Sequence, residues 1–391
     1  MTYRSKTDSP TSVLKSLMTF SLVLSLSAIT ATAKPPPGKG PGSGGGGGDD
    51  GGSAPIDYRG MQQFPIKLGT SGGWADDLAN GYCCGGTLGA LVEIGSSKYI
   101  LSNFHVLAAD VVSGGNGETA SVGDDVIQPG LIDINCNLNN TTAVATLSDW
   151  ANPLNGTNID AALAEIITGA VASDGEILGI GTLSSDTLPP SVGLRVKKSG
   201  RTTGLTTSKI DALNVSVNII YENECAGQSI GTGHFTGQIL IANKGSKFLG
   251  GGDSGSVMVE NVGTNPRAVG LLYAGSRSSA IANPIGDVLA HFGATMVGVS
   301  GSASSSSSTT TASGPSRGNG LANAIAAQER NRGLLESVPN GVGHGIGRDT
   351  AGKPIIKVFV ESDAPGARRA LPRSIEGYVI QVVETGRFYA N

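Results

Sequence analysis

Apolar residues between positions 60 and 298 occur in short runs, and turn-forming residues separate each run from the next. A segment of this kind lacks the helices of 10–15 residues that a parallel α/β fold needs between its strands. Glycine, at 60 of 391 residues, supplies the positive φ angles of tight turns. The segment is therefore predicted to be mostly β, a sandwich or a barrel. The expected strands are Leu88–Ile94, Tyr99–Ser102, Ala161–Ile167, Leu194–Lys197, Asn214–Tyr221, Val257–Glu260 and Ala268–Tyr273.

The first 33 residues have the features of a secretory signal peptide. Basic residues precede an apolar run from Leu17 to Ile29, and an Ala-Thr-Ala sequence ends at Ala33, where cleavage is expected. A retained membrane anchor is the alternative, but the run is short for a transmembrane helix. We expect a secreted or periplasmic protein that does not contact the membrane after cleavage.

Changes in composition divide the remaining chain into four parts. Residues 34–58 form a Pro/Gly-rich tether with little means of burying a core. Residues 59–298 form the β domain, residues 299–318 a Ser/Thr/Gly-rich linker, and residues 319–391 a small α+β module.

The module is predicted to place one helix, from Asn319 to Glu336, on a small sheet that contains strands Pro354–Glu361 and Gly377–Val383. Gly341–Gly347 is read as a glycine-rich strand or hairpin, since no helix follows to present its N-terminus to a phosphate. The module either assists folding or covers the cleft of the β domain; a substrate- or surface-binding appendage is the alternative.

Charge and cysteine content limit the classes of partner and of metal or disulfide site that the chain can have. Lys and Arg total 27 against 31 Asp and Glu, a balance that argues against a nucleic-acid partner. Outside the cytoplasm the four cysteines can form up to two disulfides in three connectivities. Cys83 and Cys84 are adjacent, so each is expected to take a different partner. A zinc site is the rival, but the cysteines, which include Cys136 and Cys225, lack paired C-x-x-C spacing.

The sharpest local signal is the sequence Gly-Gly-Gly-Asp-Ser-Gly-Ser from Gly250 to Ser256. The glycines permit a tight turn and leave the approach to Ser254 open. The N–H groups of Gly252 and Ser254 are candidates for donors to a developing oxyanion. By itself the sequence is equally typical of an ordinary turn.

Two further residues complete a candidate triad. His105 follows the expected strand Tyr99–Ser102, and Asp160 stands at the start of Ala161–Ile167. A lone histidine is more often structural, but a buried carboxylate needs a donor, and an imidazole N–H is a suitable one. In this hypothesis Ser254 attacks, His105 takes its proton and Asp160 steadies the imidazolium.

These residues, with their surroundings, resemble the landmarks of the trypsin/chymotrypsin-like serine proteases, and of the bacterial secreted branch in particular. The matching segments are Cys84-Gly-Gly-Thr-Leu88, Leu101-Ser-Asn-Phe-His105-Val-Leu-Ala108, Asp160-Ala-Ala-Leu163 and Gly252-Asp-Ser-Gly255. Ser199-Gly-Arg-Thr-Thr-Gly204 is similar to a segment of the α-lytic protease and streptogrisin group. The resemblance covers roughly residues 80–295. It implies two packed six-stranded antiparallel β-barrels, with the triad between them.

The resemblance also implies an activity: a serine endopeptidase that is expected to be monomeric, to act on polypeptides and to need no metal or organic cofactor. Arg201 is expected to pair with Asp253 and support the oxyanion turn. Phe248 falls near the base of the primary specificity pocket, and a substrate would pair with the strand Tyr273-Ala274-Gly275. No Asp lies between Lys244 and Gly252, so cleavage after Lys or Arg is not implied, and small or apolar residues are preferred.

Two rival functions stay open. An α/β-hydrolase requires Gly-x-Ser-x-Gly, but Ser256 occupies the final position, and the strand–elbow–helix context around Ser254 is missing. A catalytically silent protease-like protein used for binding would carry the same residues without activity.

Overall fold

The structure, a computed structural model, describes residues 55–79, 82–108, 120–223, 228–300 and 317–390. The predicted signal peptide and most of the predicted tether and linker lie outside these residues. Among the helices of the described ranges, none is long and apolar enough to cross a membrane.

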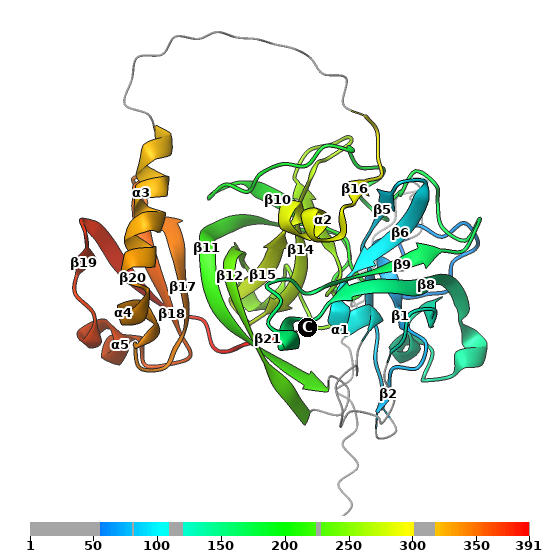
Figure 1. The fold of residues 1–391 in the computed structure, drawn as a ribbon, viewed down its shortest axis with the longest axis horizontal. Helices are drawn as coiled ribbons and strands as arrows, with labels where there is room; N and C mark the ends of the chain where they lie inside the picture. The colour runs from blue at the N-terminus through cyan, green and yellow to red at the C-terminus, as the bar shows by residue number, and fades with distance from the viewer. Residues whose placement is uncertain (1–54, 80–81, 109–119, 224–227, 301–316, 391) are drawn as a thin grey trace, which may run out of the picture. The chain divides into compact units, whose positions relative to one another are not determined.

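The first sheet consists of antiparallel strands in the order β16-β5-β6-β9-β8-β7-β1-β4 (Figure 1). Its strands are β1 (Thr70–Trp74), β4 (Gly86–Leu88), β5 (Ala90–Ile94), β6 (Ser97–Ser102), β7 (Asp125–Gln128), β8 (Thr142–Ala151), β9 (Ala161–Ile166) and β16 (Thr295–Met296). They enclose a core in which Leu91, Ile100 and Leu163 are almost fully buried. The sheet has eight strands where six were expected; β16 comes from the far end of the β domain and extends the sheet beside β5.

The second sheet closes on itself. It contains β10 (Arg195–Lys198), β11 (Thr206–Asn223), β12 (Gln228–Ala242), β13 (Val257–Glu260), β14 (Ala268–Gly275) and β15 (Ser279–Pro284). These strands pair antiparallel in the order β10-β13-β14-β15-β12-β11, and β10 also pairs with β11. The six strands therefore form the predicted antiparallel barrel, and the mostly β fold class is confirmed.

Short elements connect the strands, and one of them, the helix Ile285–Phe292, leads from the second sheet to the first. They are α1 (Phe104–Leu107), α2 (Ile285–Phe292), the 3-10 helices η1 (Leu131–Asp133), η2 (Leu138–Asn140), η3 (Pro153–Asn155) and η4 (Lys244–Ser246), and the ladder of β2 (Leu78–Ala79) with β3 (Tyr82–Cys83). Cys83 forms a disulfide with Cys136. Cys84 is also in a disulfide, whose partner lies outside the described residues. The two adjacent cysteines thus take different partners, as predicted.

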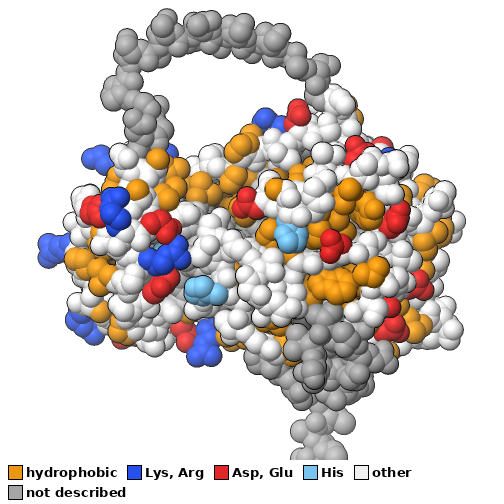
Figure 2. Space-filling model, viewed as in Figure 1, with side chains coloured by type: hydrophobic (Ala, Val, Ile, Leu, Met, Phe, Trp, Pro, Cys, Tyr) orange, Lys and Arg blue, Asp and Glu red, His pale blue; other side chains and the backbone are white. Residues whose placement is uncertain are grey.

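The module contains more elements than the sequence indicated. They are α3 (Arg317–Arg330), α4 (Arg332–Glu336), β17 (Gly341–Arg348), β18 (Pro354–Val360), α5 (Ala364–Ala370), β19 (Ser374–Ile375), β20 (Tyr378–Glu384) and β21 (Phe388–Ala390). The expected single helix is divided at Asn331, whose backbone is not helical. On the face drawn in Figure 2, Lys and Arg side chains gather over the module and are few over the first sheet.

The module does not build a separate sheet. β17 pairs with β11, so that the barrel strands continue through β17, β18 and β20 (Figure 1). The glycines of β17 make this approach possible: a Cβ at Gly343 would lie 2.4 Å from the backbone oxygen of Ser216, and one at Gly345 would lie 2.8 Å from a methyl of Val215. The glycine-rich segment is therefore a strand adapted to close packing.

This close approach generates a stability prediction. Gly343→Ala places a methyl group against a backbone atom that cannot easily move, and we expect it to lower the free energy of unfolding by about 1–3 kcal/mol. Gly333→Ala is the matched control, because a Cβ there has open space inside α4 and alanine favours a helix. Thermal unfolding of both variants provides the measurement; equal unfolding midpoints would contradict the prediction.

Candidate active site

His105 is positioned by the short helix that follows β6. The chain leaves β6 at Ser102 and enters α1 through Asn103. The neighbours of His105 on α1, Phe104 and Val106, pack in the core of the first sheet, and the histidine itself is 4% exposed. Apolar packing on both sides therefore fixes where the imidazole lies.

Asp160 directly precedes β9 and is fully buried. Its Oδ2 lies 2.6 Å from Nδ1 of His105 and accepts a hydrogen bond of 2.6 Å from the hydroxyl of Tyr221. These donors offset the cost of burying the carboxylate. We infer that Nδ1 carries a proton toward Asp160, which leaves Nε2 as the ring nitrogen that can accept one.

Tyr221 is a site residue that the sequence did not reveal. It lies on β11, and its ring is edge-on to the imidazole of His105 with 5.9 Å between centroids. Within the sequence it is only the last residue of an apolar run, and no spacing marks it. Nearby, burial and then the charge of Asp160 raise the pKa of Tyr273 well above its ordinary value, which keeps this phenol neutral.

Ser254 lies in the turn before β13. Gly252 and Gly255 on either side have φ angles of +89° and +90°, which glycine adopts without strain. The hydroxyl of Ser254 donates to the carbonyl oxygen of Tyr273 at 3.2 Å. Of the three residues of the candidate triad, all of them among the described residues, the structure joins His105 and Asp160 by a hydrogen bond, and it shows none between His105 and Ser254. The two predicted oxyanion donors, the N–H groups of Gly252 and Ser254, belong to this turn.

The turn of Ser254 packs against the first sheet close to α1. The backbone oxygen of Ser254 accepts a hydrogen bond of 2.9 Å from the N–H of Thr87. A Cβ at Gly86 would lie 2.6 Å from a methyl of Val106 and 3.1 Å from the Ser254 oxygen. Gly86 thus lies between Val106, the neighbour of His105, and the turn of Ser254, which explains why this position of the Cys-Gly-Gly-Thr-Leu segment needs a glycine.

The side chain of Asp253 stabilises the turn that carries Ser254. Its carboxylate accepts hydrogen bonds from the backbone N–H groups of Thr202, Thr203 and Gly250, and lies 3.0 Å from Nζ of Lys198. Lys198 and Asp253 are both fully buried. Burial lowers the pKa of Lys198, and the carboxylate opposes that effect.

The expected pairing of Arg201 with Asp253 is wrong. Arg201 instead forms two hydrogen bonds of 2.6 Å with the carboxylate of Asp133 in η1. Lys198, at the end of β10, takes the place proposed for the arginine. Arg201 lies in the turn beyond β10, where its backbone N–H donates to Thr87 Oγ1 and its guanidinium donates to Asp133 and to Thr202 Oγ1.

The predicted substrate-binding residues fall into two groups. Phe248 is 2% exposed and packs in the barrel core with Val196 and Met258, so its side chain is a core residue. Tyr273, Ala274 and Gly275 lie together at the end of β14, beside Ser254. Ala274 and Gly275 are already paired with a strand of this same chain, β21.

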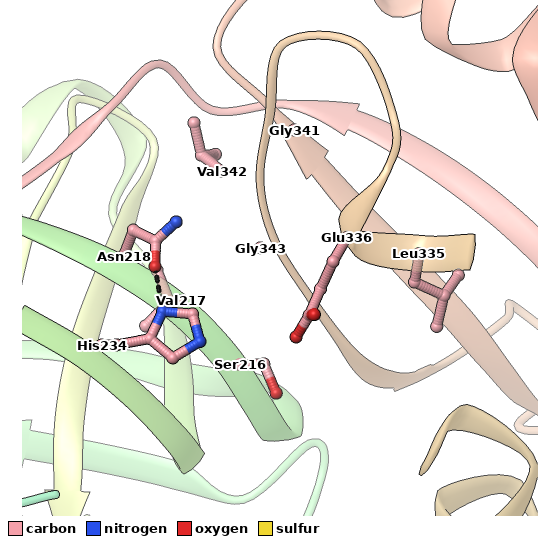
Figure 3. Close-up of a pocket in the computed structure, with 9 residues that line it drawn as sticks. All are labelled: Ser216, Val217, Asn218, His234, Leu335, Glu336, Gly341, Val342 and Gly343. Atoms are coloured by element: carbon pink, nitrogen blue, oxygen red, sulfur yellow. Dashed lines mark hydrogen bonds between the residues drawn. The ribbon is translucent and has the colours of Figure 1, made fainter. Parts of the chain in front are cut away.

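A small cavity of about 120 Å³ lies apart from these residues, where the module meets β11 (Figure 3). Ser216, Glu336 and Gly343 line it, with His234 hydrogen-bonded to Asn218 at its side. His344, buried next to it on β17, accepts a hydrogen bond from Gln328 at Nδ1. Among the described residues, no group of three or more His, Cys, Asp or Glu side chains is arranged to hold a metal.

The buried ion pair under the nucleophile turn leads to a prediction. Lys198→Met leaves the carboxylate of Asp253 buried without its cation, and we expect a loss of about 3–5 kcal/mol in the free energy of unfolding. Arg195→Met, at an exposed position of the same strand, is the control and should change stability by less than about 0.5 kcal/mol. Urea unfolding measures both; a loss no larger than that of the control would count against the role of the pair.

His344 makes stability depend on pH. Burial lowers its pKa to about 4 from an ordinary value of 6.5, against the raising effect of Glu336. The unfolded chain therefore binds the proton first as the pH falls. The contribution of His344 is complete above pH 6.5 and declines by up to about 3 kcal/mol toward pH 4. His344→Gln should flatten this part of the unfolding profile, whereas the same change at exposed His291 should not.

Comparisons with known proteins find remote likenesses in structure alone. No protein-family model and no curated protein matches the chain. A glutamic-acid-specific serine protease covers 59% of this chain with 100% of its own length, at 18% identity and a TM-score of 0.40. Protease A of Thermobifida fusca matches 60% of the chain with 98% of its length (18% identity, TM-score 0.39), and the alpha-lytic protease homologue N4 matches 59% with 98% (21%, 0.38). Each of these three likenesses is remote, with at most 21% sequence identity.

Proposed function

We propose that this protein is a secreted serine endopeptidase that hydrolyses peptide bonds through an acyl-enzyme on Ser254. His105, Asp160 and Ser254 are the catalytic residues, and the N–H groups of Gly252 and Ser254 form the oxyanion hole. The partner is a polypeptide substrate. The disulfides support an extracytoplasmic location, because such bonds persist in oxidising compartments.

The observation that carries the proposal is the buried contact between His105 Nδ1 and Asp160 Oδ2 at 2.6 Å, beside the turn of Ser254. A carboxylate placed in this way fixes the tautomer in which Nε2 is a base. Tyr221 adds a second donor to the same oxygen and holds the carboxylate in place. A histidine with only a structural role would not require a fully buried charge as its partner.

The chemistry proceeds in two halves. The Ser254 hydroxyl attacks the substrate carbonyl carbon as its proton passes to Nε2 of His105, and the carbonyl oxygen becomes an anion held by backbone N–H groups. The imidazolium then gives the proton to the leaving amine, and the acyl-enzyme forms. Water repeats the sequence and releases the acid. For the attack, the Ser254 hydroxyl must leave the carbonyl oxygen of Tyr273 and donate to the imidazole of His105.

The second candidate is a catalytically silent protease-like binding protein. One observation favours it: Ser254 is fully buried and donates to a carbonyl oxygen instead of the imidazole. The two functions differ in one measurable property, which is the reactivity of the Ser254 hydroxyl toward an electrophile.

A fluorophosphonate probe tests this reactivity. We expect it to label the wild-type chain covalently and to leave Ser254→Ala unlabelled. Ser256→Ala is the matched control, because this hydroxyl lies in the same turn but donates to the backbone oxygen of Asp253. Absence of labelling in the folded wild type would favour the binding protein.

The role of Asp160 has its own test. Asp160→Asn keeps the size of the side chain but favours the wrong tautomer of His105, and we expect kcat on a peptide substrate to fall by about 10,000-fold. Asp149→Asn, on neighbouring β8, is the control. A fall of less than about tenfold would show that the carboxylate does not act through the histidine.

A further inference from the structure

The strand β21 lies where a substrate would be expected to pair. It leaves the module and enters the barrel between β11 and β14 (Figure 1). Phe388 and Tyr389 pair with β11 in parallel, while Tyr389 and Ala390 pair antiparallel with Gly275 and Ala274. Both pairings use backbone groups, so the strand is inserted into the sheet and not merely laid over it.

The edge of β14 that receives β21 begins beside the nucleophile. Leu272 exchanges backbone hydrogen bonds with Gly255 and Ser256, and the Tyr273 oxygen accepts the Ser254 hydroxyl. The opposite edge of Ala274 and Gly275 is paired with β15. Along this edge of β14, the turn of Ser254 pairs with Leu272, and β21 pairs with the next residues, Ala274 and Gly275.

Direction and register follow from the antiparallel pairing. Tyr389 lies opposite Gly275 and Ala390 opposite Ala274, so the strand advances toward Tyr273 and hence toward Ser254. A peptide bound in this register and longer by one residue would place that residue opposite Tyr273, whose carbonyl oxygen accepts the Ser254 hydroxyl. β21 thus runs in the direction of the acyl part of a substrate.

The strand is anchored by its side chains. Phe388 is fully buried in a cluster with Tyr221, Phe235 and Tyr273. The module adds an ion pair between Arg387 and Glu361 at 2.9 Å.

We propose that β21 is an internal competitor that occupies the acyl side of the substrate site and lowers the activity of the full chain until a polypeptide displaces the strand. This inference rests on the proposed function. The displacing partner is an extended peptide that adds a strand to β14, with an aromatic side chain in the place of Phe388 and a small one in the place of Ala390.

A tethered strand is an effective competitor for a simple reason. A short connection gives it an effective concentration of about 1 mM, so that a free peptide at micromolar concentration binds poorly. The apparent affinity of the site for a free peptide is reduced by the fraction of molecules in which β21 has left. Weakening the strand should therefore increase peptide binding and Ser254 reactivity together.

The experiment uses the full chain and measures binding separately from catalysis. In a Ser254→Ala background, a fluorescent peptide Arg-Phe-Tyr-Ala is titrated by fluorescence anisotropy. Tyr389→Pro removes a backbone donor from the ladder at a side chain that is 37% exposed, and Phe388→Ala removes the anchor. Each should tighten peptide binding by at least about tenfold. Val379→Ala, at an exposed position of β20, should leave binding unchanged.

The same variants with Ser254 present are labelled by the fluorophosphonate. A labelling rate about tenfold higher in Tyr389→Pro than in wild type supports the competitor. Peptide binding that stays the same in both β21 variants, with their thermal unfolding still cooperative, overturns it, while Ser254 labelling of the wild type still supports the proposed function. Tighter peptide binding without any labelling would support β21 as the competitor for the β14 edge and would overturn the proposed protease activity. Phe388→Ala creates a cavity and could prevent folding. In that case Tyr389→Pro alone provides the test.

Discussion

The buried carboxylate of Asp160 is the point at which the two sheets depend on each other. Asp160 directly precedes β9 in the first sheet, yet its backbone N–H donates to Asn283 on β15 and its Oδ2 accepts a hydrogen bond from Tyr221 on β11. His105 completes the arrangement from the first sheet. Because an unpaired buried charge costs several kcal/mol, the barrels must come together in one way to satisfy it. The same requirement that orients the imidazole therefore also joins the sheets.

A second buried charge, the carboxylate of Asp253, supports the turn of Ser254 in the same way. The carboxylate of Asp253 collects three backbone donors and Lys198, and so fixes the turn that carries Ser254. Glycines then allow this turn to approach the first sheet closely enough for Thr87 to bond the Ser254 oxygen. His105 and Ser254 are consequently held by separate supports, one around Asp160 and one around Asp253.

The module is joined to the barrel by backbone pairing at two places. β17 extends the sheet beside β11, and β21 inserts between β11 and β14. The first contact is tight, because a Cβ at Gly343 or Gly345 of β17 would collide with atoms of β11. The second is short and ends beside Ser254, so it can be exchanged for another strand at smaller cost. A module docked through β17 keeps β21 close to the site whether or not β21 is bound there.

The sequence by itself determined the features that depend on neighbouring residues. Alternation and turn residues predicted β6, β9, β13 and β14, and the glycines around Ser254 predicted a tight turn. The motifs around His105 and Asp160 pointed to residues that the structure brings into contact. Only the tertiary structure decided which distant groups meet. It selected Lys198 over Arg201 as the partner of Asp253, brought Tyr221 to Asp160 and placed β21 on β14. Such choices depend on strand register and on which buried charges must be paired, and both are set by packing between segments that are far apart in the chain.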